Sequence, residues 1–417
     1  MSGRSAVPSD WPLIALAATL SAAGIAMVYS AGETDVPTFV QGLWRVQTVW
    51  FFLGLAVAYG ITRLSVRWLE WGAVPLYLAA TAVLLLLLFV GQGAGTAAGT
   101  KSWLAIGGVR LGQPSELAKI AVVLMLARVL AEQRSAAKSL FDLWKPALIV
   151  GIPWVFIMGQ PDLGTGLVFI GIFFAMLYWS GVTWQLLLIA ASPGISLVLA
   201  FGPGVWGAWF LLLLALVAWM RPSWLEGALV ILANVATGVV AQLVWERLNP
   251  YQQRRLFVFL DPSSDPRASG YHLIQSQVAI GSGGMFGKGF TEGTQKRLAF
   301  LPEQHTDFIY AVVGEELGFV GVAAVLALFC VLLLRTVRIA ARASSPFASL
   351  VAFGLTAAML SHILVNIGMT IGLMPITGIP LPFFSYGGSF MLSMWLAIGI
   401  LVLVSSEGRG QADGLVI

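Results

Sequence analysis

The sequence is poor in charged residues. Asp, Glu, Lys and Arg make up only 10% of its 417 residues, whereas a typical soluble domain carries about 25%. Because 58% of the residues are hydrophobic, a water-soluble fold of this length could not bury the apolar surface, but a lipid bilayer would accept it. The composition therefore excludes an ordinary soluble protein and predicts a membrane protein.

Cysteine and an excess of one charge sign are also lacking. The single cysteine, Cys330, excludes an intrachain disulfide and a cysteine-based metal site. The net charge of +4 is small, and without a basic run it gives no support to a nucleic-acid partner. The 3 histidines are scattered along the chain, so no metal site is predicted from them.

Long apolar segments are what the sequence has in abundance. A membrane-spanning helix needs about 20 apolar residues, and about twelve segments approach that length. We therefore expect an all-α polytopic membrane protein, with about 10–12 spans in a single integral-membrane domain over residues 1–417. The predicted spans are 11–30, 46–62, 72–91, 114–131, 144–160, 164–181, 185–202, 205–220, 224–245, 307–334, 347–371 and 386–405.

Lys and Arg residues predict the orientation of these spans, because cytoplasmic loops are enriched in them. They follow the second, fourth and tenth predicted spans, for example at Arg63, Arg134 and Arg338. This alternation places both termini in the cytoplasm. The loops 31–45, 92–113 and 246–306 are then expected outside.

The long outer loop, 246–306, gathers most of the residues that could carry chemistry. Asp-Pro steps at Asp261 and Asp265 predict tight turns that could hold a carboxylate at the membrane surface. The Gly-rich stretch 281–289 could bind phosphate through its backbone amides, with Lys288 adding charge. The alternative for each Asp-Pro step is an Asx-turn with a purely structural role.

The first polar region outside that loop is 92–119. Lys101 and Arg110 could bind a diphosphate. Glu116 and Lys119 lie one helical turn apart, where a simple ion pair is the alternative. Ionisable residues within a membrane segment are nevertheless candidates for function.

Later polar positions have structural alternatives of the same kind. Asp162, in the short turn 160–165, could belong to the site or cap the following helix. Ser385 lies in the region 372–388, whose Gly and Pro residues exclude a continuous lipid-facing helix. His362 is a lone histidine within a predicted span, and we interpret it as a satisfied structural residue.

Seven stretches of the chain resemble one known family. They are Gly112–Lys119, Gln160–Thr165, Ser264–Ser276, Ile280–Gln295, Leu301–Phe308, Gly314–Gly318 and Asn366–Ser389. In this order they resemble the SEDS family (shape, elongation, division and sporulation), whose members polymerise peptidoglycan glycan strands from lipid II. The segments Gly293–Gln295 and Gly378–Pro382 are more similar to elongation members than to division members. The family usually has about ten spans, so we predict that 182–223 is an extra transmembrane hairpin.

The resemblance implies a reaction and a place for it. Asp265 would be the catalytic carboxylate, acting as the general base, and the loop 246–306 would be the catalytic loop, on the outer face of a bacterial cytoplasmic (inner) membrane. The substrate would be lipid II, a disaccharide-pentapeptide on undecaprenyl diphosphate, and the diphosphate lipid would be released. The residues that we predict to bind the substrate or its diphosphate are Lys101, Arg110, Glu116, Lys119, Asp162, Gln275, Ser276, Lys288, His305 and Ser385.

The same resemblance implies partners, and it leaves alternatives open. The expected partners are a class B penicillin-binding protein, which is a transpeptidase, and other membrane proteins of the elongation complex. No cofactor is predicted, and a divalent cation at the diphosphate stays an open alternative. The rival functions are a lipid II flippase or transporter, a division-type polymerase, and a scaffold that only activates a partner.

Overall fold

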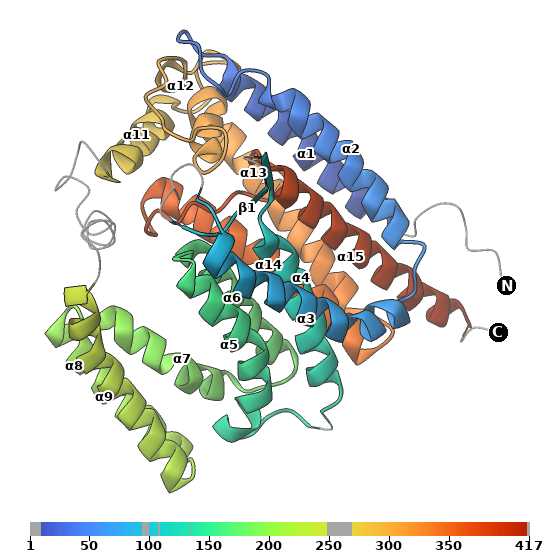
Figure 1. The fold of residues 1–417 in the computed structure, drawn as a ribbon. Coiled ribbons are helices and arrows are strands. Elements are labelled where there is room, and N and C mark those ends of the chain that lie inside the picture. The colour runs from blue at the N-terminus through green and yellow to red at the C-terminus, as the bar shows by residue number, and fades with distance from the viewer. Residues whose placement is uncertain (1–9, 94–99, 107–108, 134, 248–268, 415–417) are drawn as a thin grey trace.

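The computed structural model describes residues 10–93, 100–106, 109–133, 135–247 and 269–414. Most of this part of the chain is helical (Figure 1). The strands within the described residues form one antiparallel hairpin, β1 (Leu104–Ile106) with β2 (Val109–Gly112). The predicted all-α polytopic class is therefore confirmed.

Most of the helices belong to one bundle. Its members are α1 (Trp11–Gly32), α2 (Leu43–Ile61), α3 (Val66–Val90), α4 (Pro114–Ala131), α5 (Trp144–Gly159), α6 (Leu163–Trp179), α13 (Ile309–Ala341), α14 (Pro346–Ile371) and α15 (Gly388–Gly414). α14 and α15 are the most buried of the long apolar helices. The bundle therefore forms around α14 and α15, with α2, α4, α6 and α13 packed against them.

Length and apolarity mark 7 helical segments in the described chain as able to cross a membrane: those in α1, α3, η1–α5 (Leu140–Gly159), α9 (Trp224–Arg247), α13, α14 and α15. The apolar helices α6, α7 (Trp184–Leu199) and α8 (Pro203–Met220) are shorter. Together with α2 and α4, these helices coincide with the predicted apolar segments. α4 is not among the 7 segments, because its 18 residues include three charged ones, Glu116, Lys119 and Arg128.

Three helices extend from one side of the bundle (Figure 1): α7 (Trp184–Leu199), α8 (Pro203–Met220) and α9 (Trp224–Arg247). They pack mainly on one another. At one end, Glu226 of α9 accepts hydrogen bonds from the side chain of Ser139 and the amide of Leu140. Residues 182–223 thus contain two consecutive apolar helices, and their status as an addition to the family's fold stays a prediction.

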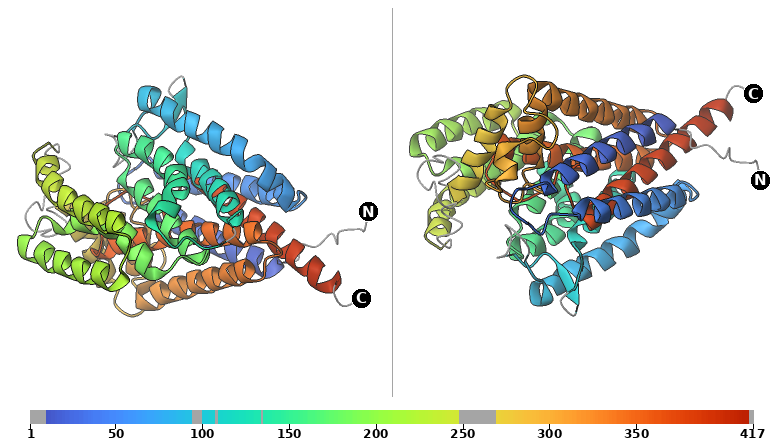
Figure 2. Two further views of the ribbon diagram at one scale, coloured as in Figure 1. Left: turned by 90° about the horizontal axis from the view of Figure 1, so that it is seen from below. Right: turned by 90° about the horizontal axis from the view of Figure 1, so that it is seen from above.

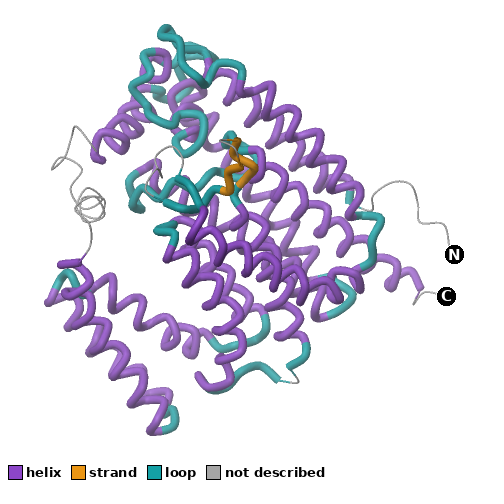
Figure 3. Tube along the Cα trace, viewed as in Figure 1, coloured by secondary structure: helices purple, strands orange, loops and turns teal. Residues whose placement is uncertain are grey.

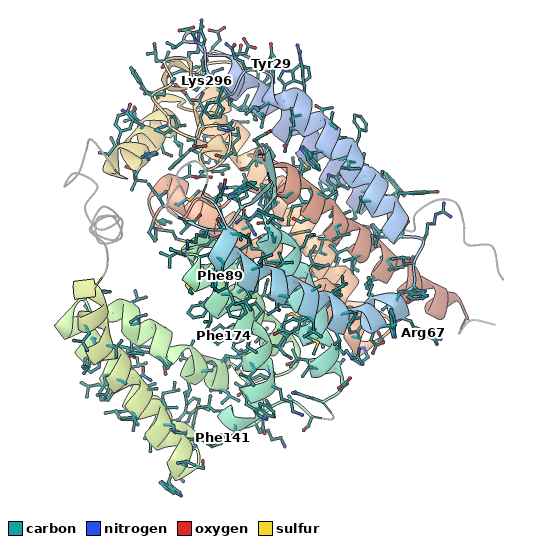
Figure 4. All side chains as sticks on the ribbon, viewed as in Figure 1. Tyr29, Arg67, Phe89, Phe141, Phe174 and Lys296 are labelled. Carbon is teal, nitrogen blue, oxygen red and sulfur yellow. The ribbon has the colours of Figure 1, made fainter. Side chains whose placement is uncertain are left out.

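The two ends of the bundle differ in character. The start of α1 and the end of α15 lie at one end, as Figures 1 and 2 show, and Arg67 lies there too (Figure 4). At the opposite end, which we call the loop end, the longer loops gather around α11 (Ser269–Ser282) and α12 (Thr294–Arg297), as Figure 3 shows. This arrangement is the one that the predicted orientation requires, and the orientation itself stays a prediction.

The Gly-rich stretch of the long loop packs against a kink in α13. The kink lies at Gly318, which has a φ of 64°. A Cβ on Gly287 would come within 2.0 Å of the Glu316 carbonyl oxygen, so only glycine permits this approach. The amide of Lys288 donates to the carbonyl of Glu315 at 3.0 Å. The amides expected to cradle phosphate are therefore partly used to hold the loop on α13.

Candidate active site

A cavity of about 420 Å³ lies among the connections at the loop end. Its walls come from segments far apart in the sequence, and four of these segments belong to the stretches that carry the family resemblance. The lining residues include Phe39, Trp50, Ser102, Trp103, Gln113, Glu116, Asp162, Thr165, Glu303, His305, Asp307, residues 377–380, Tyr386 and Phe390. Of the predicted site residues, the cavity thus brings together Glu116, Asp162 and His305.

Asp162 combines the two roles considered for it. Its Oδ1 caps α6 by accepting a hydrogen bond from the Thr165 amide at 3.0 Å. Its Oδ2 accepts from the Thr165 hydroxyl at 2.9 Å and from Gln113 Nε2 at 3.1 Å. Burial raises the pKa of Asp162 above its usual value, although these hydrogen bonds act in the opposite direction. The cap therefore fixes a carboxyl group at the cavity wall.

Glu116 lies at the cavity with Lys119 behind it. The Lys119 Nζ is 2.9 Å from Glu116 Oε1, and both residues are only 3% exposed. Lys119 is not a lining residue of the cavity, and its Nζ also lies 2.6 Å from His362 Nε2. The expected ion pair is therefore present, but its carboxylate, not its ammonium, faces the cavity.

The broken region between α14 and α15 forms another wall. Asn366 Nδ2 donates to the Ile379 carbonyl at 2.8 Å and to the Asp307 carbonyl at 3.0 Å. Ser385 Oγ donates to the Thr306 carbonyl at 2.6 Å and accepts from the Leu381 amide at 2.8 Å. Ser385 does not line the cavity, but its hydroxyl pairs with backbone groups of the wall. Backbone groups at membrane depth need such partners.

His305 lies at the cavity between two aromatic rings. Its ring centroid is 5.5 Å from that of Phe39 and 5.7 Å from that of Tyr386. Its Nε2 is 3.9 Å from a Glu303 carboxylate oxygen. Burial lowers the pKa of His305 to about 4, so the side chain is neutral at pH 7.

This burial predicts a pH-dependent loss of stability. The unfolded chain binds a proton at His305 near pH 6.5, but the folded chain does so only near pH 4. The stability that His305 contributes is therefore present above pH 6.5 and is lost as pH falls towards 4, by up to about 3 kcal/mol. We expect His305→Gln to lose less stability than the wild type between pH 7 and pH 4.5, as measured by thermal unfolding in detergent. Equal losses in the two proteins would contradict this.

No Lys or Arg is among the described residues that line the cavity. Lys101 is exposed and donates to the Leu88 carbonyl at 3.1 Å. Lys288 Nζ lies 2.9 Å from Glu315 Oε1 and 2.6 Å from Thr294 Oγ1. The structure therefore does not bring these predicted diphosphate ligands to the cavity. The side chain of Arg110 and the whole of Asp265 lie outside the described residues.

The remaining predicted residues lie on α11. Ser276 is buried and donates to the Thr370 carbonyl at 2.8 Å, so it fastens α11 to the end of α14. Gln275 is partly exposed and does not line the cavity. Ser276 thus belongs to the packing of the long loop on the bundle, and neither residue lines the cavity.

A second buried ion cluster, which the sequence analysis did not predict, lies at the loop end. The Lys296 Nζ is 3.0 Å from Glu316 Oε1 and 2.6 Å from the Ser30 carbonyl. Both charged side chains are fully buried. A carboxylate within an apolar segment must find a cation, and this was the available signal for a partner of Glu316. The cluster ties α12 to α1 and α13, and Figure 4 shows Lys296 at this end of the molecule.

The aromatic lining was also missed. Trp50, Trp103 and the neighbours Tyr386 and Phe390 come from three separate segments, and together they give the cavity broad apolar faces. Ligand pockets commonly combine such faces with a few polar groups. No sequence pattern joins these residues, because only the packing of the loops brings them together.

Comparison with known proteins identifies the family. The chain matches the model of the family FTSW_RODA_SPOVE, described as cell cycle protein, over residues 10–206 and 205–410. It is 35% identical to peptidoglycan glycosyltransferase MrdB of Escherichia coli K12, over 92% of this chain and 90% of that protein. It is 32% identical to peptidoglycan glycosyltransferase RodA of Treponema pallidum, over 95% of this chain and 98% of that protein.

Solved structures agree with these matches. A chain from a peptidoglycan synthase complex, described as coordinating polymerization and crosslinking, superposes with a TM-score of 0.72 at 31% identity, covering 95% of this chain and 97% of that one. The rod shape determining protein RodA of Thermus thermophilus superposes with a TM-score of 0.63 at 27% identity, covering 96% and 98%. The chain therefore belongs to the FtsW/RodA/SpoVE family of cell cycle proteins, which is the SEDS family indicated by its motifs.

Proposed function

We propose that this chain is a peptidoglycan glycosyltransferase that polymerises glycan strands from lipid II and releases undecaprenyl diphosphate. The observation that carries the proposal is the cavity at the loop end, whose lining includes residues of four of the seven stretches that carry the family resemblance. The names of the relatives, peptidoglycan glycosyltransferase MrdB and RodA, support the same activity.

The chemistry requires a base, an acceptor hydroxyl and a charged leaving group. We assign the base to Asp265, which would take the proton of the acceptor sugar hydroxyl as it attacks the anomeric carbon with inversion. As the new glycosidic bond forms, the bond from the anomeric carbon of the growing strand to the lipid diphosphate breaks, and the diphosphate leaves with the electron pair. Fixed cations would stabilise its charge, and Lys101 and Arg110 are the candidates nearest in sequence to the cavity wall.

The described cavity itself suits the carbohydrate part of the substrate. Glu116, Asp162, Glu303 and Asp307 line it, without Lys or Arg among the described lining residues. Carboxylates accept hydrogen bonds from sugar hydroxyls, whereas they would repel a diphosphate. Either the cations beside the cavity or a divalent cation would then serve the diphosphate.

The position of the cavity favours a transferase over a transporter. Transporters bind their substrates near the bilayer midplane, whereas the cavity is lined by residues of the connections at the loop end. We place this end on the outer side of the cytoplasmic membrane, with both termini inside, because Lys and Arg concentrate in the opposite loops.

We further propose a role in elongation, together with a class B penicillin-binding protein that cross-links the product. The residues that support elongation are Gly293–Gln295 and Gly378–Pro382. The matching chain of a complex for polymerization and crosslinking supports the partner. A division-type polymerase is the alternative, since a probable FtsW of Geobacter is 34% identical to this chain.

The proposal predicts that the purified chain, in complex with its transpeptidase partner, makes glycan polymer from lipid II. The product should appear as a ladder of glycan strands on a gel, and its amount with and without EDTA decides whether a divalent cation is required. The matched test for a transporter is the movement of fluorescent lipid II across liposomes that contain the chain. Movement of lipid II without any polymer would contradict the proposed function.

A further inference from the structure

His362 has two specific polar contacts deep within α14. It is only 1% exposed. Its Nδ1 lies 3.1 Å from the Pro380 carbonyl oxygen, and its Nε2 lies 2.6 Å from Lys119 Nζ. The imidazole therefore bridges the cavity wall at Pro380 to the ammonium group behind Glu116.

These contacts determine where the imidazole proton resides. A carbonyl oxygen only accepts hydrogen bonds, so the contact with Pro380 requires the proton on Nδ1. In the neutral ring, Nε2 is then only an acceptor, and Lys119 must donate to it. The Pro380 carbonyl thus selects the tautomer with the proton on Nδ1. In this tautomer, one N–H group of Lys119 must point at His362 Nε2.

The bridge reaches two surfaces of the cavity. Lys119 also donates to Glu116, which lines the cavity. One helical turn after His362, Asn366 donates to the carbonyl of Ile379, the residue before Pro380. α14 therefore holds two consecutive carbonyls of the wall, and through His362 it also contacts the ion pair whose Glu116 carboxylate lines the cavity.

We propose that His362 is a positioning residue for the glycosyl transfer: it orients the Lys119–Glu116 pair relative to the Pro380 wall through an Nδ1–H tautomer. The expected effect of His362 on catalysis rests on the proposed function, whereas its tautomer can be tested without that function. A histidine that only filled space would be replaceable by any apolar side chain of similar size.

The activity test compares two replacements of His362. His362→Gln can still donate to Pro380 through its NH₂ group and accept from Lys119 through its oxygen, whereas His362→Met can do neither. We expect kcat to fall about 10- to 100-fold for His362→Met, with KM changed less than about threefold, because small displacements of catalytic groups cost up to about 100-fold in rate. His362→Gln should stay within about fivefold of the wild type.

The control is Thr356→Val on the same helix. Thr356 is also buried, but among the described residues its hydroxyl donates to the Ala352 carbonyl within α14 and not to the cavity wall. This variant should keep wild-type kcat, and thermal unfolding in detergent should show that each variant is folded. Equal activities for His362→Met and His362→Gln, in folded proteins, would overturn the positioning role.

A double-mutant cycle tests whether His362 acts through Lys119. In the Lys119→Met background, His362→Met should cause little further loss of kcat, because without the Lys119 ammonium the His362 ring has no group left to orient. Losses that multiply would overturn the proposed route. This measurement separates positioning from a general packing effect, because a packing effect of His362→Met would reduce kcat by the same factor with or without Lys119.

The tautomer is tested by ¹⁵N NMR of the full-length protein labelled at its 3 histidines. The signals missing from His362→Gln identify His362, and we expect the shifts of a neutral ring protonated at Nδ1. A ring protonated at Nε2, or at both nitrogens, would overturn the proposal whether or not the protein polymerises lipid II. Failure of the polymerisation assay with the expected tautomer would instead overturn the proposed function and, with it, the positioning role of His362.

Discussion

Lys119→Met is expected to reduce polymerisation of lipid II at least about 100-fold and to lower the free energy of unfolding by about 3–5 kcal/mol. The substitution leaves the Glu116 carboxylate buried at the cavity without its cation, at a position only 3% exposed. It also removes the donor to His362. Polymerisation assays and thermal unfolding of the purified variant measure the two effects.

The matched control removes both charges. In Glu116→Gln/Lys119→Met no unpaired charge remains, so we expect this double variant to regain most of the lost stability. Its activity should stay low, because the carboxylate at the cavity is gone. A Lys119→Met protein with wild-type stability would contradict the buried ion pair, and full activity of the double variant would contradict its role in the reaction.

The helices could be predicted from the sequence because lipid leaves little choice. A long apolar segment in a bilayer must satisfy its own backbone and therefore becomes a helix. This reasoning located even α7 and α8, which the break at Gly202–Pro203–Gly204 separates. It could not show the kink at Gly318, because the predicted span 307–334 contains three glycines, Gly314, Gly318 and Gly321, and only the approach of the Gly-rich loop shows where the helix bends.

The candidate site could be predicted only where local sequence determines the contact. The Glu116–Lys119 pair and the cap formed by Asp162 are contacts within four residues, and the structure shows them. Lys288 is different: its charge and Gly-rich surroundings suggested a diphosphate ligand, but Glu315, 27 positions away, is its partner. His362 was interpreted as a structural residue because its partners, Lys119 and Pro380, come from other parts of the fold.

Asp265→Asn is expected to abolish polymerisation, with a fall in kcat of at least about 100-fold. Asparagine has nearly the same shape as aspartate but cannot accept the proton of the attacking hydroxyl. Binding of lipid II should change little, because the proposed role is proton transfer and not attachment of the substrate. Asp261→Asn is the matched control, since it removes the neighbouring carboxylate of the same loop on a similar Asp-Pro step, and only a partial loss is expected.

The most direct measurement is the amount of glycan polymer made from lipid II by three purified complexes with the transpeptidase partner: wild type, Asp261→Asn and Asp265→Asn. Each is assayed at the same concentration after thermal unfolding has shown that it is folded. We predict polymer from the wild type, a reduced amount from Asp261→Asn and none from Asp265→Asn. Near-normal polymer from Asp265→Asn would contradict the assignment of the base, and the absence of polymer from the folded wild-type complex would contradict the proposed activity itself.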